Sequence, residues 1–144
     1  MTSEVVLLDT NILLRLAEPA HPQAAAAATA VDTLRRNGDV PVVLSQNLYE
    51  FYVVATRPKA VNGLGMSPED AVSRIARIES LAIHQDDTTE VFGKWLSLVE
   101  SHAVRGKPAH DARLAAAALV HGVDAVLTFN AGDFARYGLA VRTP

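Results

Sequence analysis

Acidic side chains at the ends of predicted strands are the residues of this sequence that could carry chemistry. Asp9 follows the apolar run 5–8, which predicts a buried strand that ends at the carboxylate. An acid at the carboxyl end of a buried strand lies where open α/β sheets bind their ligands. Asp is also a preferred helix N-cap, and residues 11–16 predict a short helix. The local sequence therefore leaves two interpretations of Asp9 open, a functional acid and a cap.

Two further acids belong to helices that we predict to be buried. Glu50 is the one charge in the apolar segment 48–55. A buried carboxylate needs a proton, an ion-pair partner or a metal ion, unless it lies at the helix edge and reaches water. Asp111 opens an alanine-rich helix, where it is either a functional acid or a first-turn acid favoured by the helix dipole.

A fourth polar cluster follows the predicted strand 125–128. Asn130 and Asp133 have the spacing of a helix N-cap and its N3 partner, or they extend a polar cluster at the strand end. The carboxyl ends of parallel strands meet at one edge of a sheet, so the four acids can converge. Carboxylates in one cleft repel one another and keep protons unless cations are bound. Oxygen ligands of this kind suit Mg²⁺ or Mn²⁺ and the hydrolysis of phosphodiesters.

Other site chemistries have less support in the sequence. The chain has no cysteine, which excludes a thiolate zinc site and a cysteine nucleophile. His110 and His121 lie roughly 16 Å apart along one predicted helix, too far for one metal. Ser45 lacks a Gly-x-Ser-x-Gly elbow. Asp86 and Asp87 precede a predicted helix, and we expect them to be cap residues.

Short strands alternate with helices along the whole chain. We predict strands at 5–8, 40–44, 81–84, 125–128 and 139–141. The predicted helices are 11–16, 23–36, 45–56, 67–80, 87–102 and 111–121, with a helical turn at 130–137. This alternation predicts an α/β fold with a parallel sheet and helices on both faces. With 144 residues, no internal repeat and no linker, residues 1–144 are expected to form a single domain.

Composition limits the setting in which the protein works. Apolar residues make up 49% of the chain and charged residues 20%, as in a globular protein. No apolar stretch reaches the ~18 residues of a membrane helix, and residues 1–4 lack a basic signal region. We therefore expect a cytoplasmic protein without membrane contact. The net charge of −3 disfavours a general nucleic-acid binder but not an enzyme that uses metal ions.

Four ordered segments resemble the motifs of the PIN-domain ribonucleases, and among them the VapC-type toxins of toxin–antitoxin pairs. They are 8–11, 47–51 with 56–58, 110–112, and 127–130 with 133–134. The resemblance implies a single-domain PIN-like fold with about five parallel strands, and an endoribonuclease that depends on Mg²⁺ or Mn²⁺. It implies that the metal ligands are Asp9, Glu50 and Asp111. The supporting polar groups would be Thr10, Asn11 and Thr128.

Position 130 departs from the family pattern, because many members have Asp where this chain has Asn130. The fourth ligand is then Asp133, Asn130 or neither, which leaves open whether one or two ions bind. The resemblance also implies a small cognate antitoxin that blocks the cleft, and a homodimer. We expect the RNA backbone to be held by basic residues, chiefly Arg57, Lys59, Arg105, Lys107 and Arg113.

Three other functions stay open from the sequence. A PIN-domain nuclease or RNA-processing protein outside a toxin–antitoxin pair would carry the same residues. An aspartyl phosphotransfer enzyme would also place an acid at Asp9, but Asn11 stands where its second acid would be. In a binding module without catalysis, the acids would be caps and ion-pair partners.

Overall fold

Five strands form one parallel sheet in the computed structural model, which describes residues 3–144. The strands are β1 (Val5–Leu8), β2 (Val40–Leu44), β3 (Ile83–Gln85), β4 (Ala125–Leu127) and β5 (Ala140–Arg142). Their order across the sheet is β3-β2-β1-β4-β5. The predicted five-stranded parallel sheet is thus confirmed, and β1, which precedes Asp9, is its central strand.

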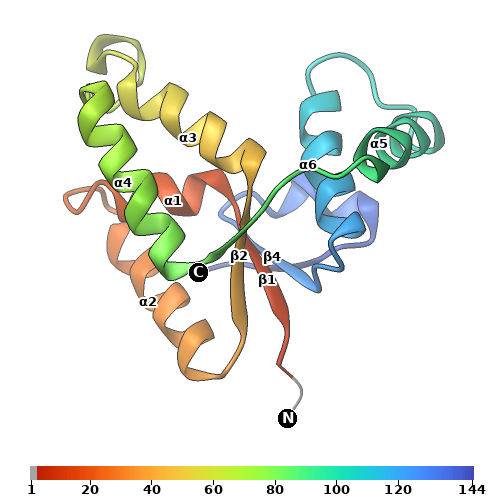
Figure 1. The fold of residues 1–144 in the computed structure, drawn as a ribbon, viewed down its shortest axis with the longest axis horizontal. Helices are drawn as coiled ribbons and strands as arrows, with labels where there is room; N and C mark the ends of the chain where they lie inside the picture. Colours follow the sequence, from red (N-terminus) through yellow and green to blue (C-terminus); the bar gives the residue numbers. More distant parts are fainter. Residues whose placement is uncertain (1–2) are drawn as a thin grey trace.

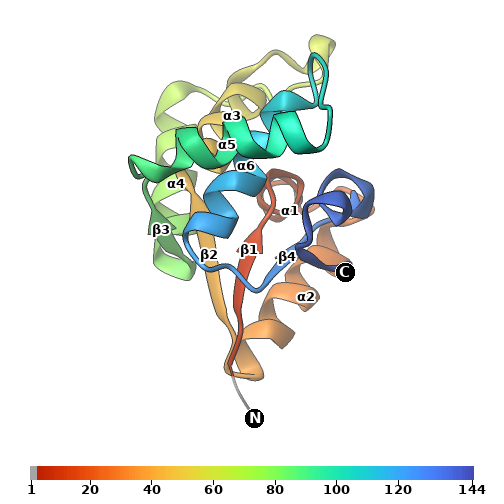
Figure 2. The ribbon, with the colours of Figure 1, turned by 90° about the vertical axis from the view of Figure 1, so that its right-hand side faces the viewer.

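Helices cover both faces of this sheet, as predicted (Figure 1). One face carries α1 (Thr10–Leu16), α2 (Ala24–Arg36), α3 (Ser45–Thr56) and α4 (Pro68–Leu81). The other face carries α5 (Glu90–Ser101) and α6 (Ala109–Val120), which cross in front of the strands in Figure 2. Residues 3–144 also contain three short 3₁₀ helices, η1 (Lys59–Val61), η2 (Ala131–Asp133) and η3 (Ala135–Tyr137).

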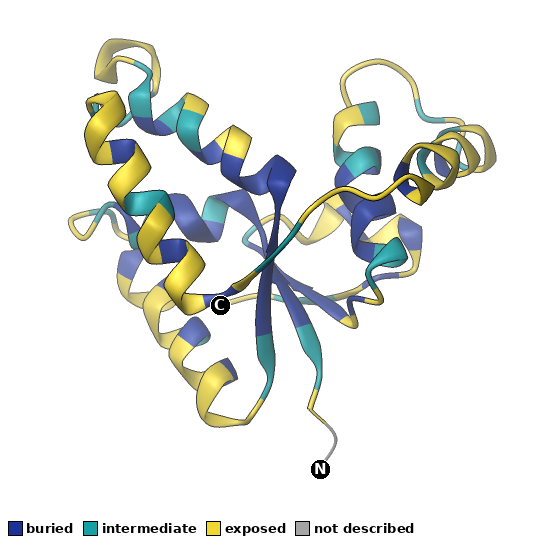
Figure 3. Cartoon of the chain, viewed as in Figure 1, coloured by how far each residue is buried: buried dark blue, intermediate teal, exposed yellow. Residues whose placement is uncertain are grey.

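Two apolar clusters, one on each side of the sheet, form the core. Successive strand residues point to opposite faces, so Leu8 packs against α1 to α4, whereas Leu7 packs against α5 and α6. The buried residues line the inner sides of both helix layers (Figure 3). Ala115, Ala116 and Ala118 are fully or almost fully buried, and their small side chains bring α6 close to the sheet. Its first turn, with Asp111, is thereby held near the carboxyl ends of the strands.

Two helix starts differ from the sequence-based expectation. The expected cap of α3 was Ser45, but Leu44 occupies the N-cap position and the Asn47 side chain accepts its N–H at 2.9 Å. The expected caps Asp86 and Asp87 lie before Glu90, where α5 begins, and do not cap it. The Asp86 carboxylate accepts a hydrogen bond from the Ser45 hydroxyl at 2.9 Å instead. Ser45 and Asp86 thus bond to each other, 41 residues apart, and neither caps the helix that it precedes.

The segment after β4 also differs in detail from its prediction. A helical turn was expected at 130–137, and the chain forms the two 3₁₀ helices η2 and η3 there. Asn130 occupies the N-cap position of η2, as its spacing predicted, but its side chain makes no capping hydrogen bond. Phe134, between the two turns, is 1% exposed and belongs to the cluster under α5 and α6. This buried ring anchors the loop that carries Asp133.

Phe134→Ala is expected to lower the free energy of unfolding by about 3–5 kcal/mol, because it removes a buried ring and leaves a cavity. Phe92→Ala is the matched control, since Phe92 is 66% exposed and its truncation should change stability by no more than about 0.5 kcal/mol. Urea unfolding of both variants measures the difference. Equal losses of stability in the two variants would contradict the placement of Phe134.

Within residues 3–144, no helix is both long enough and apolar enough to cross a membrane.

Candidate functional site

The carboxylate of Asp9 lies at the carboxyl end of the central strand and is 8% exposed. Its Oδ1 accepts the N–H of Thr10 at 2.8 Å, so Asp9 is the N-cap of α1. Its Oδ2 accepts the hydroxyl of Thr128 at 2.8 Å and the side-chain amide of Asn11 at 3.3 Å. The two interpretations of Asp9 are therefore compatible, because one oxygen caps the helix and the other faces a polar cluster.

The three predicted supporting residues join the ends of β1 and β4. The Thr128 hydroxyl oxygen accepts the Asn11 amide at 3.1 Å and the Asn130 backbone N–H at 2.9 Å. The Thr10 hydroxyl accepts the side-chain amide of Asn47 at 3.3 Å. Asn47 is fully buried and was not among the site residues predicted from the sequence. A buried network of this kind holds the Asp9 carboxylate in one orientation.

Burial raises the pKa of Asp9 to about 6 from its ordinary value of 3.8. The hydrogen bonds from Thr128 and Thr10 lower this pKa, while the charges of Glu50 and Asp133 raise it further. The hydrogen bonds thus recover only part of the cost of taking a carboxylate out of water. A positive charge near Asp9 would offset the remaining free-energy cost.

Glu50 lies on a helix that is less buried than the sequence indicated. The α3 residues Tyr49 and Val53 are 64% and 57% exposed, so the prediction of a helix buried on all sides is wrong. Glu50 itself reaches water, at a pocket of about 390 Å³ that Asp111 also lines. Loss of hydration in this pocket is the main cause that raises the pKa of Glu50. The hydrogen bond from Gln46 lowers the pKa, and the Asp111 charge raises it.

Three of the four predicted acids have a raised pKa, and the charge of the fourth, Asp133, contributes to two of these shifts. Asp111, in the first turn of α6, has a pKa raised by partial burial and then by the charge of Asp133. The charges of Glu50 and Asp133 raise the pKa of Asp9, and the charge of Asp111 raises the pKa of Glu50. The structure therefore brings Glu50 of α3 and Asp111 of α6 to one pocket, while Asp9 and Asp133 do not line it. Asn130 follows β4, where it is exposed and bonds to Thr128 through its backbone.

The donor set fits a hydrated divalent cation. Among residues 3–144, no three His, Asp or Glu side chains lie close enough to hold an ion by direct contact alone. Mg²⁺ keeps several of its waters and needs only one or two protein carboxylates. Neighbouring carboxylates whose charges oppose ionisation can ionise together once a cation lies among them.

Comparison with protein families decides the identity of the fold. A family model described as the PIN domain matches residues 5–132. The chain belongs to the PIN-domain family. Proteins of this family generally use divalent metal ions. Comparison with curated proteins gave no significant sequence match.

Solved structures share the fold of this PIN domain over nearly its whole length. A chain of VapBC2 from Rickettsia felis, bound to a promoter DNA fragment, has a TM-score of 0.72 at 16% identity, with 97% of this chain and 98% of that chain covered. VapC20 of Mycobacterium tuberculosis, a toxin that cleaves the sarcin-ricin loop, has a TM-score of 0.69 at 18% identity, with coverages of 96% and 99%. VapBC-1 from Haemophilus influenzae has a TM-score of 0.65 at 18% identity, with coverages of 96% and 97%. The resemblance to VapC-type proteins is thus confirmed at the level of the fold.

Gln46 also lines the pocket that holds Glu50 and Asp111, which we call the acidic pocket. It was not among the site residues predicted from the sequence. It is 7% exposed, and its amide group donates to the Glu50 carboxylate at 2.9 Å and to the His110 carbonyl at 3.0 Å. Its side-chain oxygen accepts from Arg113 at 2.9 Å, and Arg113 also pairs with Asp87. Gln46 thereby joins the start of α3 to the start of α6. No sequence motif marks it, because its partners lie far along the chain.

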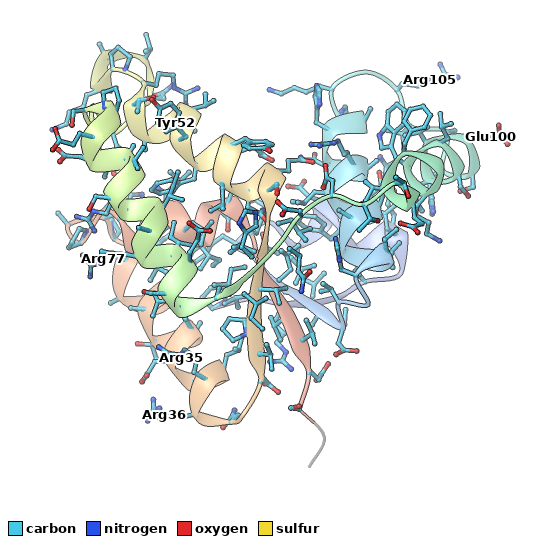
Figure 4. The ribbon with its side chains drawn as sticks, viewed as in Figure 1. Arg35, Arg36, Tyr52, Arg77, Glu100 and Arg105 are labelled. Atoms are coloured by element: carbon cyan, nitrogen blue, oxygen red, sulfur yellow. The ribbon has the colours of Figure 1, made fainter. Side chains whose placement is uncertain are left out.

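The predicted RNA-binding residues occupy two regions of the PIN domain. Lys107 and Arg113 line the acidic pocket, and Arg105 lies in the loop between α5 and α6, labelled in Figure 4. Arg57 and Lys59 follow α3, about 10 Å along the helix from Glu50. Arg57 donates to the carbonyl of Asn62 at 3.0 Å, which folds it onto its own loop. The structure thus brings two of the five basic residues to the acids.

Proposed function

We propose that this PIN domain is an endoribonuclease that depends on Mg²⁺ or Mn²⁺, and that it is the toxin of a type II toxin–antitoxin pair. The observation that carries the proposal is the buried carboxylate of Asp9 at the carboxyl end of β1, with Glu50 and Asp111 together in one pocket. Asp9, the most buried of them, has a pKa raised to about 6. Perturbed acids clustered in this way are typical of functional sites.

The chain's own residues have separate roles in this proposal. Asp9, Glu50 and Asp111 would bind the divalent cation, and Asp133 or Asn130 would complete the site. A bound cation would activate a water and stabilise the leaving oxygen. Thr10, Asn11 and Thr128 orient the Asp9 carboxylate through the bonds described above. Lys107 and Arg113 supply positive charge at the rim, where the RNA phosphate would lie.

An RNA cleavage assay tests the reaction. The purified protein, given Mg²⁺ or Mn²⁺, is expected to cut single-stranded or looped RNA into products with 5′-phosphate and 3′-hydroxyl ends. A chelator is expected to stop the cleavage, because the acids then lack the charge that lets them act together. Cleavage that continues in excess chelator would overturn the metal-dependent mechanism.

Gln46→Ala is expected to lower kcat by about 10- to 100-fold, the range seen when residues that orient metal ligands are removed. The substitution deletes the bond that holds the Glu50 carboxylate and also the bond from Arg113, so the KM for RNA should rise, but by a smaller factor than kcat falls. Gln23→Ala is the control, since Gln23 bonds to Arg15 on the far side of α1. Thermal unfolding checks that both variants fold. A change in KM with an unchanged kcat would contradict a positioning role.

An antitoxin partner is proposed from the solved relatives, among which is a toxin–antitoxin complex from Klebsiella pneumoniae. The exposed side chains of Tyr49 and Val53 on α3 flank Glu50 in sequence, and exposed apolar groups mark protein contacts. The test is co-expression with the product of a short neighbouring reading frame that encodes a DNA-binding protein. Co-purification with loss of RNA cleavage is the expected result. If no neighbouring product binds, a PIN-domain nuclease outside a toxin–antitoxin pair is the better description.

A homodimer is also proposed, and sedimentation of the purified protein tests it. A monomer at all concentrations would contradict it.

A further inference from the structure

We propose that a second pocket, between α5 and the start of α6, binds an unpaired nucleobase of the RNA. This stacking pocket has a volume of about 420 Å³, within the usual range of ligand sites. Phe92 and Trp95 form its aromatic side, and Asp87, His110 and Arg113 form its polar side. The inference rests on the proposed RNA substrate and adds a place where one base of that RNA is held.

The aromatic side offers a flat surface that the fold itself does not use. Phe92 is 66% exposed, although its ring is apolar. Its ring centre lies 6.0 Å from that of Trp95, with 30° between the ring planes. The indole N–H of Trp95 donates to the Ala109 carbonyl at 2.8 Å, which fixes the ring before any ligand arrives. Aromatic side chains of this kind stack on the π-face of any base.

The polar side supplies groups that match the edge of a base. Arg113 is held by Gln46 and Asp87, so its guanidinium is already in place at the pocket wall. Guanidinium donors match the carbonyl oxygens of a base, and a carboxylate such as that of Asp87 accepts from an amino group. A purely apolar partner would remove water from these charged groups without offering them a new hydrogen bond, at a cost. The mixture of aromatic and polar walls therefore favours a base over an apolar helix from another protein.

The stacking pocket adjoins the acidic pocket. His110 and Arg113 line both of them, and Lys107 adds a positive charge on the acidic side. An RNA strand whose phosphate lies at Glu50 and Asp111 would therefore pass directly beside Phe92 and Trp95. A base next to the cut phosphate must leave its own stack to enter the pocket, which selects single-stranded or looped RNA.

Trp95 gives a direct test, because it is the only tryptophan of the chain. A short single-stranded RNA, added in excess chelator so that it is not cut, is expected to quench the Trp95 fluorescence. An abasic oligonucleotide of the same length should bind more weakly and quench less. Phe92→Ala should weaken RNA binding by about 5- to 150-fold, the equivalent of one lost stacking contact. Leu96→Ala is the control, since Leu96 is 45% exposed on the same helix but does not line the pocket.

Three results would overturn the proposal that this pocket binds a base. Equal binding of the abasic strand would show that only phosphates are recognised. Equal weakening by Leu96→Ala would show a general effect on α5. Phe92→Ala that turns a dimer into a monomer in sedimentation, with RNA affinity unchanged, would assign this face to a second copy of the chain. Cleavage without quenching rejects the stacking pocket alone, whereas quenching without cleavage in Mg²⁺ or Mn²⁺ rejects the proposed hydrolysis alone.

Discussion

Asp9→Asn is expected to abolish RNA cleavage and, in the same molecule, to stabilise the metal-free protein above pH 6. The loss of activity should be at least about 100-fold, because a divalent cation contributes several kcal/mol to a reaction of this type. Asn is neutral and binds such an ion weakly. It can still cap α1 through its side-chain oxygen, as Asp9 does toward Thr10. Initial rates of RNA cleavage at saturating Mn²⁺ measure the first effect.

The stabilisation follows from the raised pKa of Asp9. In the folded protein this pKa is about 6, against 3.8 for the ordinary group, so the folded state holds a proton that the unfolded state has lost. The free energy of unfolding therefore falls as the pH rises from about 4 to about 6, by about 3 kcal/mol in total for this group. The amide side chain of the variant has no charge to desolvate. The difference in Tm between variant and parent should appear over this pH window and persist above it.

Thermal unfolding in excess chelator, across this pH range, checks the stabilisation. Glu100→Gln is the control, since Glu100 is an exposed acid near the end of α5, labelled in Figure 4. It should change neither the cleavage rate nor the pH profile of the Tm. A lower Tm for Asp9→Asn than for the parent above pH 6 would contradict the burial argument. An unchanged cleavage rate would reject Asp9 as a metal ligand.

Addition of Mn²⁺ is expected to stabilise the parent protein by about 2.7 kcal/mol when the ion is present at about 100 times its Kd. The cation binds only where the acids are assembled, and assembly occurs in the folded state. Asp9, Glu50 and Asp111 come from three separate segments, so the unfolded chain has no comparable site. The Tm measured with and without Mn²⁺ reports the effect, without any need for RNA.

Substitutions at the proposed ligands show how much each of them contributes to the stabilisation by Mn²⁺. Glu50→Gln and Asp111→Asn are expected to remove most of it. Asp133→Asn and Asn130→Ala, compared with each other, identify the fourth ligand, because only the residue that binds the ion should change the response to Mn²⁺. Glu100→Gln should keep the full response. A parent protein that Mn²⁺ does not stabilise would support a binding module in which the acids are only caps and ion-pair partners.

Local sequence predicted the elements well where one residue type decides the structure. Ser67 before Pro68 predicted the start of α4, and the Ser67 hydroxyl accepts the N–H of Asp70 at 3.1 Å. The apolar run before Asp9 predicted β1, which is buried apart from its first residue. The alternation of strands and helices was sufficient for the parallel sheet, because parallel strands need a crossover between them.

The sequence was misleading where a side chain had a choice between a near and a distant partner. Asp87 has the position of a helix cap, yet it pairs with Arg113, 26 residues away. Tyr49 and Val53 have the composition of a buried helix face, yet they are exposed because α3 packs on the sheet along its other side. Apolar composition alone does not give the direction in which a helix packs.

The sequence by itself determined the family, the order of the strands along the chain, and the four acids that could act together. Each of these depends on residue type and spacing, which the sequence contains. Only the tertiary structure decided that Asp9 is both a cap and a buried acid, that Glu50 and Asp111 share a pocket, and that Gln46 connects Glu50 to Arg113. These properties depend on distances between segments far apart in the chain and on the water that their packing excludes.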